Sequence, residues 1–264
     1  MSEIDKKKQT PYSLLGRIWY ELEYFVVIAG LLFIWILADK SGHLRAAVMP
    51  GPETVWHTFW SRLLDGTLPA AVGISVVRVL EGYGLSVVLG IALGSLIGLS
   101  KHVQRMTDLL IQILRPIPPI AWIPLAILWI GIGEGSKVFL IFLGGFFVIL
   151  VNVIDGIRYT DDRMLEVAKV CGVSHRRVLT EVVIPGAMPS IFTGLRVGIN
   201  SCWTCVVAAE LVASSSGIGY MISNARNYGQ MDVVIVGMLT IGVVGKLMDV
   251  ALRALEKKVI YWKV

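Results

Sequence analysis

The stretch Glu-Val-Ala-Lys-Val-Cys-Gly-Val-Ser-His-Arg-Arg-Val-Leu-Thr-Glu-Val-Val-Ile-Pro, from Glu166 to Pro185, is the longest charged, loop-like segment in a chain dominated by apolar runs. Good helix formers and an acidic start predict a short helix over 161–170, because acidic side chains stabilise a helix N-terminus. Gly172 ends that helix, a second amphipathic turn follows, and Pro185 begins the next apolar run. The segment therefore predicts two short, water-facing helices that meet at a glycine.

The composition of the rest of the chain is that of a membrane protein. Of 264 residues, 55% are hydrophobic and 16% are charged, whereas soluble proteins carry about 25% charged residues. The net charge of +5 comes from basic residues between apolar runs, a pattern that membrane topology explains without nucleic-acid binding. The three cysteines form neither a disulfide framework nor a zinc-binding pattern.

Apolar runs predict an all-α polytopic membrane protein with about six transmembrane helices. The polar segment 1–23 precedes the first run, and Trp19 and Tyr20 are expected to anchor that helix at the interface. No small-x-small cleavage site closes the first run at Ala38, so we expect a retained helix and not a removed signal peptide. The expected spans are residues 24–38, 82–100, 109–133, 138–154, 189–211 and 233–252.

The second expected span carries a small residue at every fourth position. This spacing places the small side chains on one face of a helix, where another backbone can approach closely. Close helix packing is the expected use, and a gas or ion path along the same stripe is the alternative. The stripe consists of Gly82, Ser86, Gly90, Gly94 and Gly98.

Prolines interrupt the third expected span and exclude a regular helix throughout. Irregular backbone at membrane depth is tolerated only where protein or a water-filled cavity covers it. The segment is therefore a candidate lining of a transport pathway, with Pro118, Pro119 and Trp122 as its lining residues. The alternative is a kinked entry turn, with the span proper starting near Ala121.

Polar residues also interrupt the fifth expected span. Arg196 and Glu210 are fourteen residues apart, about 21 Å along a helix, so both are expected near opposite interfaces, where long side chains can reach water. Asn200 and Trp203 lie between them and, with Glu210, are candidate pathway residues. A buried asparagine bonded to a neighbouring helix is the alternative for Asn200. Cys202-Trp-Thr-Cys205 imitates a redox motif, but its mid-span position favours core packing.

The segment 166–185 resembles the signature loop of permease subunits of ATP-binding-cassette importers. Glu166, Ala168, Gly172, Ile184 and Pro185 fall in step with that motif, while Val167 stands where the family usually has alanine. In that family the loop forms a coupling helix that docks on a separate ATPase subunit. An interfacial amphipathic hairpin without a partner is the alternative. The resemblance implies these ATPase-coupling residues: Glu166, Ala168, Gly172, Val173, Ser174, Arg176 and Pro185.

Two further segments, 115–126 and 194–210, resemble permeases for nitrate, sulfonates and taurine. The resemblance implies a type I importer permease fold, called MetI-like, in one transmembrane domain over 24–264 with a coupling loop at 155–185. It also implies two ATPase subunits that bind ATP and Mg, a second permease chain in a homodimer, and a periplasmic or lipid-anchored solute-binding protein. This chain is then expected to bind no cofactor or metal, to have no catalytic residues, and to transport a small anionic solute.

Basic residues set the expected orientation. They are dense in the N-terminal segment, at Lys101 and Arg105, over 158–177 and in the tail, so the positive-inside rule places both termini and the Glu166 loop in the cytoplasm. We therefore expect a multi-pass protein of the bacterial inner membrane.

The segment 131–137 imitates a phosphate-binding loop, but its spacing does not match. An ion-coupled secondary transporter is the rival class, and it would need internal repeats and coupling charges within the membrane.

Overall fold

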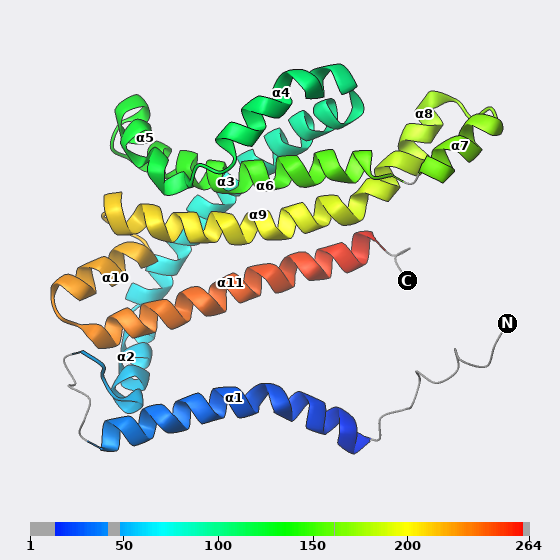
Figure 1. Cartoon of the computed structure of the whole chain (residues 1–264). Coiled ribbons are helices and arrows are strands. Elements are labelled where there is room, and N and C mark those ends of the chain that lie inside the picture. The colour runs from blue at the N-terminus through cyan, green and yellow to red at the C-terminus, as the bar shows by residue number, and fades with distance from the viewer. Residues whose placement is uncertain (1–13, 42–47, 161, 261–264) are drawn as a thin grey trace.

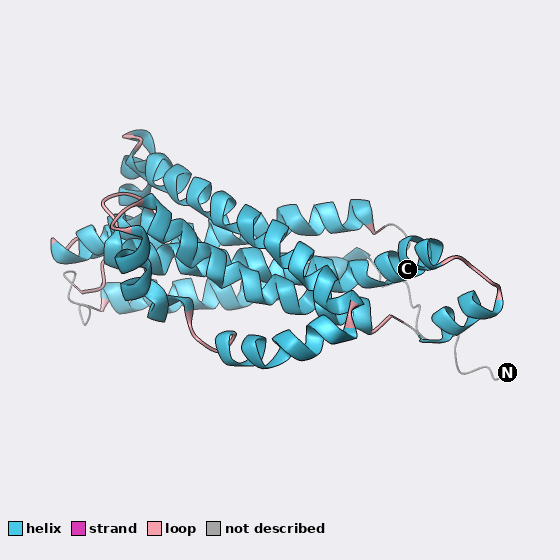
Figure 2. Ribbon diagram, turned by 90° about the horizontal axis from the view of Figure 1, so that it is seen from above, coloured by secondary structure: helices cyan, strands magenta, loops and turns pink. Residues whose placement is uncertain are grey.

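The computed structural model describes residues 14–41, 48–160 and 162–260, and in these ranges the protein is helical without a strand (Figures 1 and 2). The first 13 residues and the side chains of Trp19 and Tyr20 lie outside the described part. Four described helices are long and apolar enough to cross a membrane, or five if one sharply bent pair counts as a span. The helix α1, Leu14–Lys40, is the remaining apolar helix, and its side chains are described only from Val26 onward.

The second span is longer than the sequence indicated. After α2, Pro52–Leu64, the helix α3 runs from Thr67 to Leu99, so it begins fifteen residues before Gly82. The additional turns carry Arg78, which is only 3% exposed. A charge inside this apolar helix is tolerated because it is paired, as described below.

The stripe of small residues on α3 packs against α6, Glu134–Arg158. A Cβ atom at Gly94 would lie 2.8 Å from Cβ of Val153, and one at Gly90 would lie 2.9 Å from Cγ2 of Ile149. At Gly98 the nearest atom, Cβ of Ile157, would be 3.1 Å away. The stripe therefore provides the close approach of two long helices, and this packing sets their spacing.

The third span is broken. The helices α4, Lys101–Leu114, and α5, Ile123–Ile130, are joined by a short 3-10 helix, η2, at Pro119–Trp122. The two halves are bent by 89° at the break. Proline cannot donate a backbone hydrogen bond, so the helix ends where prolines follow one another.

The last third of the chain contains α9, Ile184–Ala213, the short helix α10, Ile218–Asn227, and α11, Met231–Val259. Lys246 and Asp249 are three residues apart in the sixth expected span, a spacing that predicts mutual charge compensation. This prediction is wrong. Asp249 instead pairs with Arg196 of α9 at 3.3 Å and with Arg253 at 2.8 Å. Arg196 thus joins two spans, because the geometry of packing brings α11 against α9.

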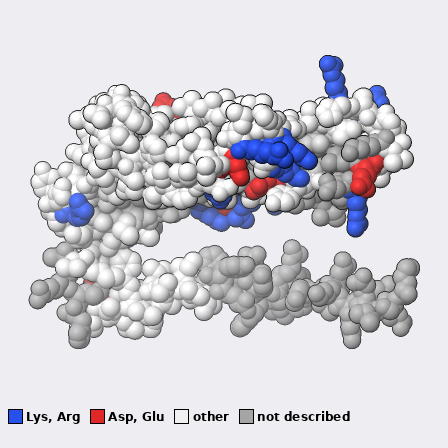
Figure 3. Space-filling view, turned by 45° about the horizontal axis from the view of Figure 1, so that its top comes forward, with Lys and Arg blue, Asp and Glu red and all other residues white. Residues whose placement is uncertain are grey.

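The long helices run side by side, and the loops lie at the two ends of the bundle (Figures 1 and 2). Helices α5 and α10 lie at one end, and α7 and α8 project at the other, on the side where α1 begins and α11 ends (Figure 1). The face in Figure 3 is largely uncharged, and most of its charged residues gather toward the half that carries α7 and α8. This distribution suits a bundle that spans a bilayer.

Candidate functional site: the elbow, the α9 face and the buried ion network

The expected pair of short helices is present and is here called the elbow, residues 162–183. Its first helix, α7, covers Asp162–Val170. Gly172 follows with a φ of +64°, a conformation that glycine adopts without steric strain. The amide of Val173 donates to the carbonyl of Ala168 at 3.0 Å. This arrangement is a Schellman cap, which ends the helix and turns the chain sharply.

The second arm of the elbow consists of α8, His175–Arg177, and a π-helical segment, η3, Val178–Val183. Helix α7 contacts η3, and Ala168 is buried, so a small side chain suits this position. The expected coupling loop 155–185 differs at both ends, because 155–158 belong to α6 and α9 begins at Ile184. Of the predicted coupling residues, Glu166, Ser174 and Arg176 are exposed and Pro185 lies in the first turn of α9.

The outer face of α7 carries three exposed apolar side chains, with the exposed Arg163 on the same side. Met164, Val167 and Val170 are 61%, 62% and 88% exposed, and their spacing of three residues places them along one side of the helix. The elbow also carries exposed polar and basic side chains, including Glu166 on α7 and Arg176 on α8. An exposed apolar stripe with a charged rim is the composition of a protein-binding surface.

A second feature is the exposed face of α9. Thr193, Val197, Asn200 and Thr204 are all exposed, and their spacing of four, three and four residues places them on one side of the helix. Both threonines donate their hydroxyl groups to α9 carbonyls, at 2.9 and 3.1 Å. Asn200 is exposed in the middle of α9, so it is not buried against another helix of its own chain.

The broken third span approaches this face. A cavity of about 270 Å³ is lined by Pro118 and Pro119 of the break and by Thr204 and Cys205 of α9. Trp122 is half-buried and packs beside this cavity against the cluster around Ile123. The structure therefore brings the prolines and the polar face of α9 to the same region.

Two other expected pathway residues are buried elsewhere. Trp203 is 5% exposed, and its indole N–H donates to the carbonyl of Ile241 on α11 at 3.0 Å. Glu210 lies in the last turn of α9, toward one end of the span as expected, but it is 1% exposed, so its carboxylate does not extend to water. Residues 200 and 203 lie only about 60° apart around the helix, so the boundary between the exposed face of α9 and the face packed in the core falls between them.

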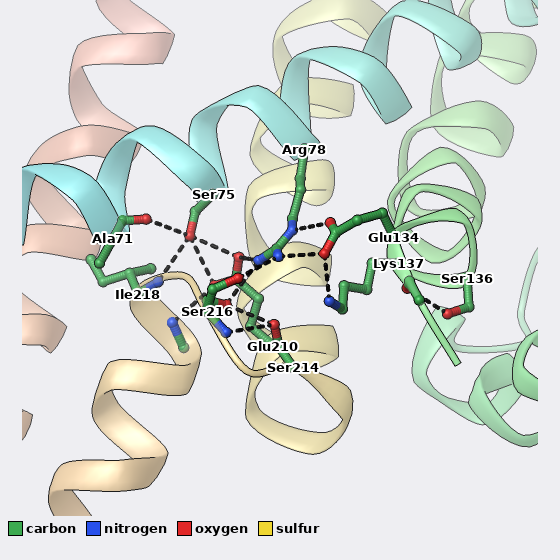
Figure 4. A network of polar contacts seen from close by, with 12 residues as sticks. Ala71, Ser75, Arg78, Glu134, Ser136, Lys137, Glu210, Ser214, Ser216 and Ile218 are labelled. Carbon is green, nitrogen blue, oxygen red and sulfur yellow. Dashed lines mark hydrogen bonds and ion pairs between the residues drawn. The ribbon is translucent and has the colours of Figure 1, made fainter. Parts of the chain in front are cut away.

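Glu210 belongs to an ion network inside the bundle (Figure 4). Its carboxylate accepts from Nη1 of Arg78 at 2.7 Å, from the hydroxyl of Ser75 at 2.8 Å and from the amide of Gly219 at 2.9 Å. A carboxylate with these donors is stable out of water because its charge and its lone pairs are satisfied.

The same network reaches α6 and the loop before α10 (Figure 4). Nη2 of Arg78 donates to Glu134 at 2.7 Å, and Lys137 donates to the same carboxylate at 2.8 Å. Arg78 also donates to the carbonyl of Ser216 at 2.9 Å. Four segments are thereby joined at the end of the bundle opposite the elbow. The partners of Arg78 could not be identified from the sequence. An arginine in an apolar run nevertheless indicates that it is paired inside the membrane protein.

Comparison with known proteins identifies the class. Residues 86–261 match the family described as the inner membrane component of binding-protein-dependent transport systems. The chain belongs to this family of type I ABC importer permeases.

Named relatives agree with this assignment. A Methanocaldococcus jannaschii protein named as an ABC transporter permease is 45% identical over 90% of this chain and 88% of its own length. A Bacillus subtilis protein named as an aliphatic sulfonates transport permease is 39% identical, over 89% and 85% respectively. An Escherichia coli protein named as a taurine transport system permease is 33% identical, over 89% and 87%.

Solved structures show the same fold at low sequence identity. A chain of the inward-facing MetNI methionine ABC transporter has a TM-score of 0.60 and 15% identity, with 75% of this chain and 96% of that chain covered. The expected all-α, MetI-like fold is confirmed.

Proposed function

We propose that this chain is the transmembrane subunit of an ATP-driven importer of a small anionic solute, of the sulfonate or taurine type or nitrate-like, that a solute-binding protein delivers. The family assignment supports the permease role, and the names of relatives support the solute class. The observation that carries the coupling role is the elbow, in which a glycine-dependent turn presents an apolar stripe away from the bundle.

In this proposal the elbow docks on an ATPase subunit, which binds the ATP and Mg. Met164, Val167 and Val170 provide apolar contacts, and Arg176 lies at the rim. The elbow continues directly into α9 through η3 and Pro185. A displacement of the elbow by the ATPase would therefore move α9, and ATP-driven closure would be converted into helix motion.

The pathway lies on the exposed face of α9, opposite a second copy of this chain. Asn200 at mid-span is unfavourable against lipid, so it faces water or protein. Both threonine hydroxyls on this face already donate to the helix, so the Asn200 amide is the donor available to an anion. Two copies would place two such amides across one pathway, with two ATPase subunits on the elbows and both elbows in the cytoplasm.

Co-purification with a cognate ATPase subunit tests the proposal. Val170→Asp should reduce recovery of the ATPase at least tenfold, because a charge in the apolar stripe opposes burial at an interface. Leu64→Asp is the matched control, since Leu64 is also highly exposed, at 81%, and lies on α2 at the opposite end. Equal recovery with both variants would contradict the docking role, as would uptake that survives ATP depletion and collapses with the ion gradient.

A further inference from the structure

The elbow joins α9 through the π-helical turn η3, Val178–Val183. The amide of Ile184 donates to the carbonyl of Leu179, five residues earlier, whereas an α-helix pairs residues that are four apart. A π-helical turn within an α-helix therefore contains one additional residue, and such turns are a known cause of helix kinks. The chain from the elbow into the bundle is thus α-helical before and after η3 but not within it.

The sequence around η3 explains why the helix is irregular there. Pro185 has no amide hydrogen, so it donates no bond to the preceding turn, and in a regular helix its ring would crowd a carbonyl of that turn. A wider turn relieves this crowding. In addition, the hydroxyl of Thr180 donates to the carbonyl of Arg176 at 3.0 Å, which gives that carbonyl a donor other than a backbone amide.

The contacts of the chain differ on the two sides of η3. On the bundle side, a Cβ atom at Gly156 of α6 would lie 2.9 Å from the carbonyl oxygen of Ala187, so the backbones of α6 and α9 are in direct contact. The hydroxyl of Ser190 also donates to the carbonyl of Asn152 at 2.9 Å. All six residues of η3, by contrast, are half-buried or exposed, and α7 and α8 project from the bundle (Figure 1). A change of shape in η3 therefore costs little core packing.

We propose that η3 is a joint that bends when an ATPase subunit moves the elbow. The orientation of the elbow is set by the surface on which it docks, and the tilt of α9 is set by its contacts with α6, so the angle between them must change where the helix is weakest. The additional residue of the π-helical turn allows this change, as a few residues at the end of a packed element do in other hinges. Motion at η3 leaves the contacts of α9 with α6 intact, so these two helices move together. The inference rests on the proposed docking of the elbow and adds the place where the motion is taken up.

Hydrogen exchange locates the joint. The full-length permease, assembled with its ATPase subunits in nanodiscs, is compared without nucleotide and with ATP and Mg bound to a hydrolysis-deficient ATPase. We expect the amides of residues 179–184 to exchange at least about tenfold faster than those of residues 190–199, and to change rate by about threefold or more on ATP binding. Equal rates in the two segments, or an equal response of both to ATP, would overturn the proposal.

Deletion of Val182 tests whether the additional residue matters. Removal of one residue converts a π-helical turn into an α-helical turn and leaves the helices on both sides in the same rotational phase. We expect recovery of the ATPase subunits to stay within about twofold of the unaltered protein, and ATP hydrolysis by the complex to fall at least about tenfold because the joint is stiffer. Val182→Ala keeps the chain length and is the matched control, with hydrolysis unchanged.

Two outcomes of the deletion would contradict the joint. Hydrolysis equal to that of Val182→Ala would show that the additional residue is not needed. Loss of the ATPase subunits from the deletion variant would show that the phase of the helix is not preserved, and thus that η3 does not hold one residue in excess. Recovery of the ATPase subunits with Val170→Asp reports on the proposed docking separately.

Discussion

Replacement of Glu210 by alanine is the most direct test of the buried ion network. Glu210 has no exposed side-chain surface in its ion pair with Arg78, and it also accepts from Ser75 and Gly219. Removal of one partner of a buried ion pair lowers the free energy of unfolding by about 3–5 kcal/mol, because the other charge remains buried without full compensation. Arg78 retains Glu134, so we expect the lower half of that range. By the scaling for domains of similar size this corresponds to a melting temperature lower by on the order of 10 °C.

The assay is thermal unfolding of the detergent-purified permease, followed by circular dichroism and by a fluorescent thiol probe for buried cysteines. Glu53→Ala is the control, because Glu53 is 90% exposed in its contact with His57 and should change the melting temperature by less than about 2 °C. Proteolysis around the start of α10 should also accelerate in Glu210→Ala, since the amide of Gly219 loses its acceptor and Arg78, which donates to Ser216, loses one of its carboxylate partners. A melting temperature equal to that of the Glu53 variant would refute the reasoning.

Three further substitutions test the elbow, the helix contact and the pathway. Gly172→Pro should abolish coupled ATP hydrolysis with membrane insertion intact, because proline cannot adopt the φ of +64°; normal transport would contradict the coupling role. Gly94→Leu should lower the free energy of unfolding by about 1–3 kcal/mol, because the larger side chain overpacks against α6. Gly84→Ala is the control and should not change it, since no atom lies within 4 Å of a Cβ at this position. Equal melting temperatures of the two variants would exclude the close contact of α3 and α6. Asn200→Leu should reduce uptake at least tenfold at an unchanged melting temperature. Val197→Leu, on the same exposed face, should leave uptake unchanged. Equal uptake by the two variants would show that Asn200 does not belong to the pathway.

Some features of this protein follow from local sequence alone. The apolar runs predict transmembrane helices, because a bilayer accepts only backbone whose hydrogen bonds are satisfied internally. The elbow is local too, since an acidic start, a glycine with positive φ and a proline at the next helix act within a few residues. The small residues of α3 also predict close packing by their spacing.

Other features exist only in the folded chain. Sequence spacing places Lys246 and Asp249 on one face, but the partner of Asp249 is Arg196, which only the packing of α11 on α9 brings near. The ion network of Arg78 and Glu210 joins residues 132 positions apart, and no local pattern encodes such a pairing.

The different burial of Asn200 and Trp203 also could not be predicted from the sequence. Both are suitable pathway residues by composition, and the packing of α9 against α3, α6 and α11 buries only Trp203. Local physical chemistry thus determines which segments are helices and where they turn. Tertiary packing determines which side chains meet, because a helix face acquires its environment from neighbours that are distant in sequence.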